Sequence, residues 1–372
     1  MKIGIVCYPT YGGSGVVATE LGLEMAALGH EVHFITYSQP VRLDLSLPNV
    51  FFHEVVVSDY PLFDYSPYEL VLTSKLVSVI KEQALDILHV HYAIPHASAA
   101  YMAKQILKSD GIELPIVCTL HGTDITLLGK DSSFEPVITF AINKSDAVTA
   151  VSESLKKDTF NHFAVNRRVD VIPNFINLER YKNLGRSELR LQYAQDDIPL
   201  VVHVSNFRKV KRVQDVVKVF CGIRSKIEAR LLLVGDGPER YNVEQLCRQQ
   251  GCCADIHFLG KSDRVEEILS NSDLFLLPSE TESFGLAALE AMAAGVPVIS
   301  SNSGGLPEVN EHGYSGYLCN VGDVAGMTEH ALEVLSNPDT MRKFSEQAKA
   351  QAARFSLHEI IPQYEALYRS LL

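Results

Sequence analysis

Two series of short apolar segments, separated by helical patterns, constrain the fold of this chain most strongly. The first series comprises residues 2–7, 31–37, 86–91, 115–120 and 147–151, and the second comprises residues 200–204, 230–235, 256–259, 273–277 and 296–300. In the helical segment that ends at Gly29, Val17, Leu21 and Met25 recur at helical spacing. Strands that alternate with helices indicate doubly wound, mostly parallel sheets. We therefore expect an α/β chain with two Rossmann-like domains.

The domain boundary is predicted between the two series. The 372 residues suffice for two domains of ordinary size. The segment 171–177 and the polar stretch up to Asp197 separate the series. We place the first domain at residues 1–173 and the second at residues 174–356, and residues 357–372 have the pattern of an amphipathic helix.

Charge and hydropathy argue against several classes of protein. The net charge of −12 disfavours nucleic-acid binding, which depends on phosphate neutralisation by Lys and Arg. The negative charge also makes an anionic membrane surface a less favourable partner. No apolar run approaches the ~20 residues of a membrane span, and the first residues read as a strand and not as a leader. We expect a cytoplasmic protein without nucleic-acid or membrane partners, and a homo-oligomer stays open.

The cysteines and histidines give no clear metal or redox motif. The seven cysteines show neither C-x-x-C nor metal-ligand spacing, so we interpret them as reduced thiols. Cys252 and Cys253 could form a redox pair, but a solvent-facing turn is the favoured interpretation. His89 and His91 share one strand face and, with His96, could suggest a metal site. A structural role is favoured because no further ligand has a suitable spacing.

Two glutamates lie eight positions apart where an apolar strand leads into a helix. Residues 286–294 are strong helix formers closed by Gly295, so Glu282 lies in the loop and Glu290 in the helix. The first turn of such a helix offers N–H groups to phosphate or sugar oxygens. Ligands of open α/β sheets bind at the carboxyl ends of strands. We therefore favour a nucleotide-sugar site over the alternative that both glutamates are ordinary surface residues.

A glycine-rich motif near the N-terminus is also compatible with a different class of enzyme. Residues 13–18 match the G-x-G-x-x-A form of the dinucleotide fingerprint, so an NAD(P)-dependent oxidoreductase is a remote alternative. That fingerprint also needs an acidic residue at the end of the second strand, and this strand ends at Ser38 without one. We expect the glycines to let the backbone approach a donor phosphate or an acceptor.

These motifs resemble those of the retaining glycosyltransferases of family 4. The resemblance rests on Glu282, Phe284-Gly285, Glu290 and the later segment 304–308, Gly-Gly-Leu-Pro-Glu, and it covers nearly the whole chain. It implies the GT-B fold, in which two Rossmann-like domains face a central cleft and the last helix packs back on the first domain. The first domain would bind the acceptor and the second the nucleotide sugar.

The resemblance also implies roles for single residues. Lys211 matches a lysine that reaches the donor diphosphate, whereas Asn206 stands where an arginine is expected and Arg208 is the candidate replacement. His121 would face the donor hexose, Glu282 the sugar hydroxyls and Glu290 the ribose. The donor-binding set is Gly13, Ser14, Gly15, Asn206, Arg208, Lys211, Glu282, Ser283, Phe284, Gly285, Leu286 and Glu290, and the catalytic set is His121, Lys211 and Glu282.

The implied mechanism is transfer with retention at the anomeric carbon. No carboxylate is an evident nucleophile, so we expect a front-face route in which the leaving diphosphate accepts the proton of the acceptor hydroxyl. The sequence contains no D-x-D motif, with which the other large glycosyltransferase fold holds a divalent metal. The prediction is catalysis without a metal or cofactor.

Four segments, 12–15, 89–96, 121–129 and 205–212, resemble those of a subgroup that opens bacillithiol biosynthesis. Its enzymes transfer N-acetylglucosamine from UDP-N-acetylglucosamine to L-malate and release UDP. Because malate is a dianion, its site needs cations or converging amides. The acceptor candidates are Ser14, Tyr92 and Thr123, with Arg42, Lys130 and the N-terminus of the first helix as charge partners.

Two other functions stay open. A family 4 enzyme could act on a lipid or another small-molecule acceptor, and a lipid acceptor should be accompanied by a basic amphipathic face in the first domain. A nonenzymatic sugar-binding module would need neither the basic cluster at residues 208–212, Arg-Lys-Val-Lys-Arg, nor both glutamates. The choice between N-acetylglucosamine and glucose as donor sugar also stays open.

Overall fold

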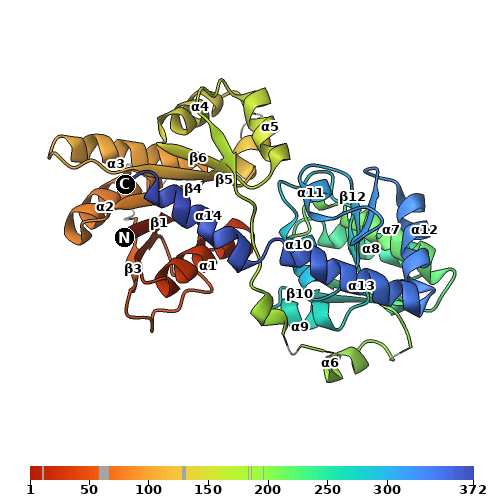
Figure 1. Cartoon of the computed structure of the whole chain (residues 1–372). Helices are drawn as coiled ribbons and strands as arrows, with labels where there is room; N and C mark the ends of the chain where they lie inside the picture. Colours follow the sequence, from red (N-terminus) through yellow and green to blue (C-terminus); the bar gives the residue numbers. More distant parts are fainter. Residues whose placement is uncertain (11, 58–66, 128–130, 183, 186, 196) are drawn as a thin grey trace. The chain divides into compact units, whose positions relative to one another are not determined.

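The computed structural model describes residues 1–10, 12–57, 67–127, 131–182, 184–185, 187–195 and 197–372 (Figure 1). Their contacts divide the chain into two compact units. The first unit comprises Met1–Asn174 with Leu357–Leu372, and the second comprises Phe175–Ser356. The first unit thus extends one residue beyond the boundary expected from the sequence.

The first unit is built on a seven-stranded parallel sheet with the order β3-β2-β1-β4-β5-β6-β7. Its strands are β1 (Lys2–Val6), β2 (Glu31–Thr36), β3 (Val50–Glu54), β4 (Ile87–His91), β5 (Ile116–Leu120), β6 (Ala147–Ala150) and β7 (Val169–Val171). Every residue of β4 and β5 is buried, as expected for central strands covered on both faces.

Helices and two short turns connect these strands. They are α1 (Ser14–Ala27), α2 (Tyr68–Gln83), η1 (Ala93–Ala97), α3 (Ser98–Lys108), η2 (Thr123–Leu127), α4 (Glu135–Lys144) and α5 (Glu153–His162). The turns η1 and η2 follow β4 and β5 directly, so they lie at the carboxyl ends of the two central strands. No helix among the described residues is both long and apolar enough to cross a membrane.

The last helix, α14 (Leu357–Arg369), packs beside α1 in the first unit (Figure 1). Polar contacts add to this packing. The hydroxyl of Tyr368 lies 2.6 Å from Nδ1 of His89, and Nε2 of His30 lies 3.1 Å from Oε1 of Glu365. Tyr364 and Tyr368 are both fully buried, so α14 is part of the core of this unit.

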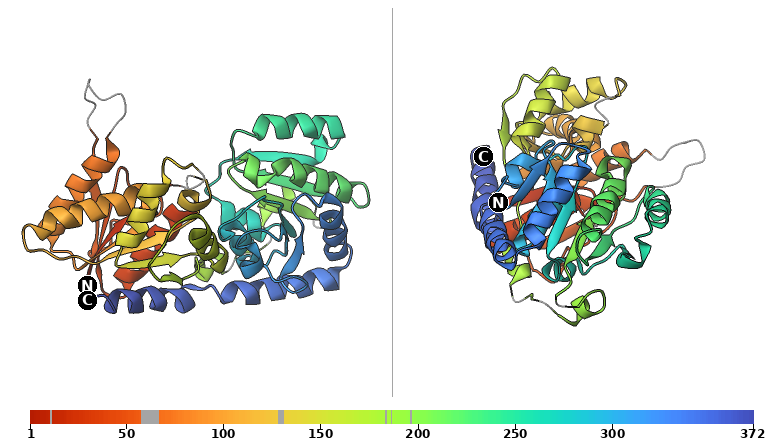
Figure 2. Two further views of the ribbon diagram at one scale, coloured as in Figure 1. Left: turned by 90° about the horizontal axis from the view of Figure 1, so that it is seen from above. Right: turned by 90° about the vertical axis from the view of Figure 1, so that its right-hand side faces the viewer.

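The second unit is built on a six-stranded parallel sheet with the order β10-β9-β8-β11-β12-β13, with helices on both sides (Figure 2). Its strands are β8 (Leu200–Val204), β9 (Arg230–Val234), β10 (Ile256–Gly260), β11 (Leu274–Leu277), β12 (Val298–Ser301) and β13 (Gly316–Cys319). Its helices and turns are η4 (Leu178–Tyr181), α6 (Glu188–Leu191), η5 (Lys209–Lys211), α7 (Val213–Arg224), α8 (Arg240–Gln250), η6 (Cys253–Asp255), α9 (Val265–Ser270), α10 (Leu286–Ala293), α11 (Leu306–Val309), α12 (Val324–Leu335) and α13 (Pro338–Ala353).

All ten strands expected from the sequence are present, with ends that differ by at most two residues. Three further strands, β3, β7 and β13, were not expected. Each of them lies at an edge of its sheet. The prediction of an α/β chain with two doubly wound sheets is confirmed.

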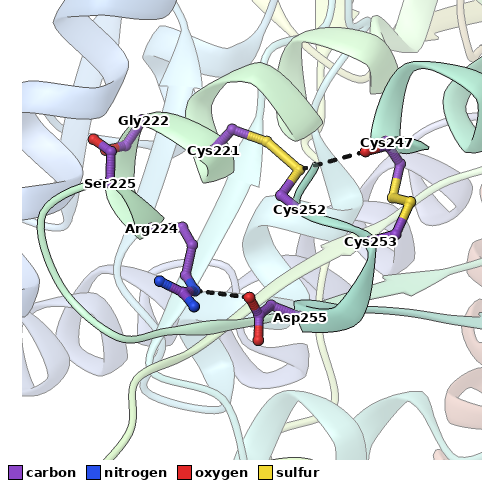
Figure 3. Close-up of a disulfide and its surroundings, with 8 residues drawn as sticks. All are labelled: Cys221, Gly222, Arg224, Ser225, Cys247, Cys252, Cys253 and Asp255. Atoms are coloured by element: carbon purple, nitrogen blue, oxygen red, sulfur yellow. Dashed lines mark hydrogen bonds and ion pairs between the residues drawn. A yellow bond between two sulfur atoms is a disulfide. The ribbon is translucent and has the colours of Figure 1, made fainter. Parts of the chain in front are cut away.

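The prediction that the cysteines are reduced thiols is wrong for four of them. One disulfide joins Cys221 to Cys252, and a second joins Cys247 to Cys253 (Figure 3). The first members of the two pairs lie on the adjacent helices α7 and α8, and the second members lie at the start of the turn before β10. Cys252 is buried, whereas Cys253 is half-buried and its neighbours Gly251 and Ala254 are exposed, so the turn itself faces solvent. Cys7, Cys118 and Cys319 are free and buried.

Candidate active site

The expected site residues fall into two groups, one in each unit. The group in the second unit includes Glu282, in the loop between β11 and α10. Its Oε1 accepts hydrogen bonds from Nζ of Lys211 at 2.6 Å and from Oγ of Ser279 at 2.8 Å. The side chains of Lys211 and Glu282 are 21% and 13% exposed, so the ion pair can meet a ligand from solvent. The structure therefore brings together two predicted residues that follow the neighbouring strands β8 and β11.

A pair of glycines supports the backbone of Glu282. Gly304 has a φ of +61°, and a Cβ atom there would lie 2.0 Å from the carbonyl oxygen of Glu282. The N–H of Gly305 donates to that same oxygen at 2.8 Å. The hydroxyl of Ser303 also donates to the carbonyl of Glu280 at 2.6 Å. The loop after β12 thus fixes the position of the loop that carries Glu282.

Helix α10 begins directly after this loop. Gly285 precedes its first residue with a φ of +104° and, as a glycine, provides no side-chain cap at the N-terminus. Phe284 is buried, whereas Ser283 and Leu286 are partly exposed. Glu290 lies on α10 and is partly buried. The uncapped first turn carries N–H groups and the positive end of the helix dipole, which favour an anionic ligand.

The basic segment after β8 forms the other side of this group. Asn206 and Arg208 are exposed, and Phe207 between them is fully buried with a φ of +29°. Gly235 and Gly237 pack against this segment, because Cβ atoms there would lie 1.8 and 2.3 Å from the carbonyl oxygens of Ser205 and Asn206. These two glycines were not predicted as site residues, although Gly-Asp-Gly after a strand is a visible turn signal.

The group in the first unit contains the three predicted acceptor residues. The hydroxyl of Ser14, at the start of α1, lies 2.6 Å from the hydroxyl of Tyr92, which follows β4. Tyr92 also forms a side-chain hydrogen bond with Thr123, which follows β5, and burial raises the pKa of the phenol to about 12. Tyr92 is therefore a neutral group that can donate or accept a hydrogen bond. The structure brings the three hydroxyls together.

His121 lies at the end of β5, next to the same cluster. Its Nε2 is 2.8 Å from Nδ1 of His91, and its ring is stacked on that of His91. The ring of Tyr92 lies 5.2 Å away, between centroids. Burial lowers the pKa of His121 to about 3, so the imidazole is neutral near pH 7. A neutral imidazole can donate one hydrogen bond to a sugar oxygen without acting as an acid.

The other histidines of this region have structural partners. His89 is bonded to Tyr368 through Nδ1 and to Thr119 through Nε2, at 2.6 and 2.7 Å. His96 is bonded through Nδ1 to the carbonyl of His91. Within the described ranges, no group of three or more His, Cys, Asp or Glu side chains is arranged to hold a metal ion.

Asp124 connects the turn after Tyr92 with the segment before Thr123. Its carboxylate accepts hydrogen bonds from the N–H groups of Ala93 and Gly122, at 2.8 and 3.2 Å. Burial raises the pKa of this carboxyl to about 6. Asp124 was not predicted as a site residue, although its segment was part of the resemblance. Its carboxylate positions η1 relative to η2.

The remaining predicted residues have largely structural partners. A Cβ atom at Gly15 would lie 2.4 Å from the carbonyl oxygen of Tyr8, so close packing requires this glycine. Gly13 has a φ of +63° and precedes α1, whose N-terminus has no side-chain cap. Arg42 is paired with Glu20 on α1. Lys130 lies outside the described residues.

Comparisons with known proteins identify the family. The profile described as Glycosyltransferase Family 4 matches residues 11–180, and the profile described as Glycosyl transferases group 1 matches residues 186–351. The chain is 49% identical to the N-acetyl-alpha-D-glucosaminyl L-malate synthase of Bacillus anthracis, in an alignment that covers 100% of this chain and 97% of that protein. It is 30% identical to an uncharacterized glycosyltransferase of Methanocaldococcus jannaschii, with 85% of this chain and 84% of that protein covered.

Solved structures show the same fold. The Anabaena protein Alr3699/HepE, in complex with UDP and glucose, superimposes with a TM-score of 0.83 at 20% identity, with full coverage of both chains. Sucrose-phosphate synthase from Thermosynechococcus elongatus gives 0.80 at 21% identity, covering 100% of this chain and 98% of that one. These likenesses confirm the GT-B fold expected from the sequence. The chain therefore belongs to the glycosyltransferases of family 4.

Proposed function

We propose that this chain transfers N-acetylglucosamine from UDP-N-acetylglucosamine to the hydroxyl of L-malate and releases UDP, the first step of bacillithiol biosynthesis. The observation that carries the proposal is the 49% identity over the whole chain to the malate synthase of Bacillus anthracis. The family assignment disfavours the oxidoreductase alternative and the nonenzymatic sugar-binding module.

The second unit is proposed to bind the donor. Lys211 and Arg208 would offset the negative charge that the diphosphate gains as it leaves, together with the uncapped N-terminus of α10. Glu282 would accept hydrogen bonds from hydroxyls of the donor sugar, and Glu290 from the ribose. The ion pair between Lys211 and Glu282 supports this arrangement, because it places a cation and a hydroxyl acceptor 2.6 Å apart.

The proposed reaction retains the anomeric configuration and proceeds on one face of the sugar. The acceptor hydroxyl attacks the anomeric carbon as the bond to the diphosphate breaks, and a diphosphate oxygen takes the hydroxyl proton. Glu282 is proposed to bind and not to attack. Its Oε1 accepts hydrogen bonds from Lys211 and Ser279, which hold the carboxylate in place as an acceptor for sugar hydroxyls. Trapping of a covalent glycosyl enzyme at Glu282 or Glu290, formed at a competent rate, would contradict this step.

The first unit is proposed to bind malate. The hydroxyls of Ser14, Tyr92 and Thr123 can donate to carboxylate oxygens, and the uncapped N-terminus of α1 favours a negative charge. His121 would donate to the donor hexose. We propose that Lys211 and Arg208 stabilise the leaving diphosphate, so that no metal ion is needed.

A cytoplasmic location without nucleic-acid or membrane partners is also proposed, in keeping with the net charge of −12. Cell fractionation followed by immunoblotting tests this location, and recovery of the protein in the membrane fraction would contradict it.

An acceptor panel tests the proposed substrates. The purified protein is incubated with UDP-N-acetylglucosamine and EDTA, and UDP release is measured with L-malate, with other small hydroxyl compounds and with lipid vesicles. Release that depends on malate and persists in EDTA is the expected result. Release with lipid alone would favour the lipid-acceptor alternative, and release with malate that is abolished by EDTA would contradict metal independence. UDP-glucose in parallel tests the donor sugar.

A further inference from the structure

The contact between His91 and His121 determines which nitrogen of each ring carries the proton. His91 is fully buried on β4, with ring centroids 4.4 Å from His89 and 5.1 Å from His121. Its Nδ1 lies 2.8 Å from Nε2 of His121. Its Nε2 is also buried and has no hydrogen-bond partner among the described residues.

Both imidazoles are neutral near pH 7. Burial lowers the pKa of His91 well below its usual value and that of His121 to about 3. A neutral imidazole has one N–H and one lone pair. Two arrangements therefore satisfy the contact: His91 donates through Nδ1–H to Nε2 of His121, or His121 donates through Nε2–H to Nδ1 of His91.

The burial of His91 distinguishes the two arrangements. If His121 were the donor, the proton of His91 would sit on Nε2, as a buried N–H without an acceptor. If His91 is the donor, only a lone pair lacks a partner. Orphaned buried N–H groups are rarer in proteins than under-satisfied acceptors, so the second arrangement is favoured.

His96 provides an independent example of the same choice. Its Nδ1 faces the carbonyl oxygen of His91, which can only accept, so its proton must be on Nδ1. Its Nε2 therefore carries the lone pair, and this atom is also buried without a partner among the described residues. This region thus already contains a buried, unpartnered Nε2 lone pair.

We propose that His91 is a positioning residue that holds His121 in the Nδ1–H tautomer. Nε2 of His121 is then occupied as an acceptor, and Nδ1–H is the group that His121 offers to a ligand. The recognised partner is a hydrogen-bond acceptor, such as a hydroxyl or carbonyl oxygen of the donor sugar. This last step rests on the proposed function, whereas the tautomer is a property of the free protein.

Nuclear magnetic resonance tests the tautomer without any substrate. The full chain is labelled with ¹⁵N-histidine, and long-range ¹H–¹⁵N correlations of the rings are recorded near pH 7. His91→Asn and His121→Asn variants assign the two rings. Protons on Nδ1 of both rings are the expected result. A proton on Nε2 of His121 would overturn the proposal, whatever the enzyme transfers.

Variants test whether the contact affects catalysis. His91→Asn keeps an amide N–H near the position of Nδ1, whereas His91→Leu removes the donor. We expect His91→Leu to lose the single tautomer of His121 and to lower kcat by about tenfold, which is the effect of one hydrogen bond. We expect His91→Asn to keep the tautomer and most of kcat, as should His358→Asn, a control at an exposed histidine on α14. Equal losses of kcat in both His91 variants, or an unchanged His121 tautomer in His91→Leu, would overturn the proposal.

Discussion

Gly304→Ala should damage donor binding through the backbone of Glu282. The new Cβ would lie 2.0 Å from the carbonyl oxygen of Glu282, whereas ordinary contacts begin at 3.4 Å, so the two must separate by about 3.4 − 2.0 = 1.4 Å. The neighbouring atoms are backbone, which cannot rotate away. A displacement of about 1 Å in a catalytic group costs about 100-fold in rate. We expect kcat/KM for the donor to fall by about that factor.

The control for backbone conformation is Gly313→Ala. Gly313 has a φ of +76°, similar to the +61° of Gly304, but a Cβ there would meet no atom within 4 Å. In both variants the free energy of unfolding should fall by about 1–2 kcal/mol, because alanine disfavours the positive φ of these positions. Only Gly304→Ala should add the steric cost, about 1–3 kcal/mol.

Urea unfolding and initial rates of UDP release measure the two effects separately. We expect normal kcat/KM in Gly313→Ala and a loss of about 100-fold in Gly304→Ala, measured without urea, where both variants are folded. Equal kcat/KM in the two variants would refute the proposed support of Glu282 by Gly304.

Three further predictions concern the first unit. Tyr92→Phe removes the hydroxyl that Ser14 contacts, so KM for malate should rise about tenfold while KM for the donor is unchanged; a change in donor KM alone would contradict the assignment. Burial raises the pKa of Asp124 from 3.8 to about 6, so the folded state binds this proton more tightly and stability falls as pH rises from about 4 to 6. Asp124→Asn should remove that part of the slope in urea unfolding, up to about 3 kcal/mol, and an unchanged slope would be evidence against it. Tyr368→Phe leaves Nδ1 of His89 without its partner and should cost about 1–3 kcal/mol, whereas Tyr241→Phe, at a side chain that is 69% exposed, should cost nothing measurable; similar values for both would contradict a role of α14 in the core.

The sequence predicted the central strands because their residues are buried on both faces. Such strands read as continuous apolar runs. The strands that were missed, β3, β7 and β13, lie at sheet edges, where fewer side chains are covered. In β3, for example, Phe51 is 38% exposed and Glu54 is also exposed, so the apolar pattern is interrupted.

Contacts that depend on how elements pack were harder to predict. Lys211 and Glu282 follow neighbouring strands, so their proximity agrees with the resemblance. The pairing of His91 with His121 depends on the register of β4 and β5, in which His91 lies opposite Thr119. The cysteine pairs depend on the packing of α7 and α8, which the spacings of 31 and 6 residues do not reveal.

The most direct test of the central claim is identification of the reaction product. The protein is incubated with UDP-N-acetylglucosamine and L-malate, and the product is analysed by mass spectrometry and by the coupling constant of its anomeric proton. The account predicts one N-acetylglucosamine joined to malate through an α-linkage, in the configuration of the donor, together with an equal amount of UDP. A β-linked product would contradict retention, and UDP without a malate glycoside would contradict the proposed acceptor.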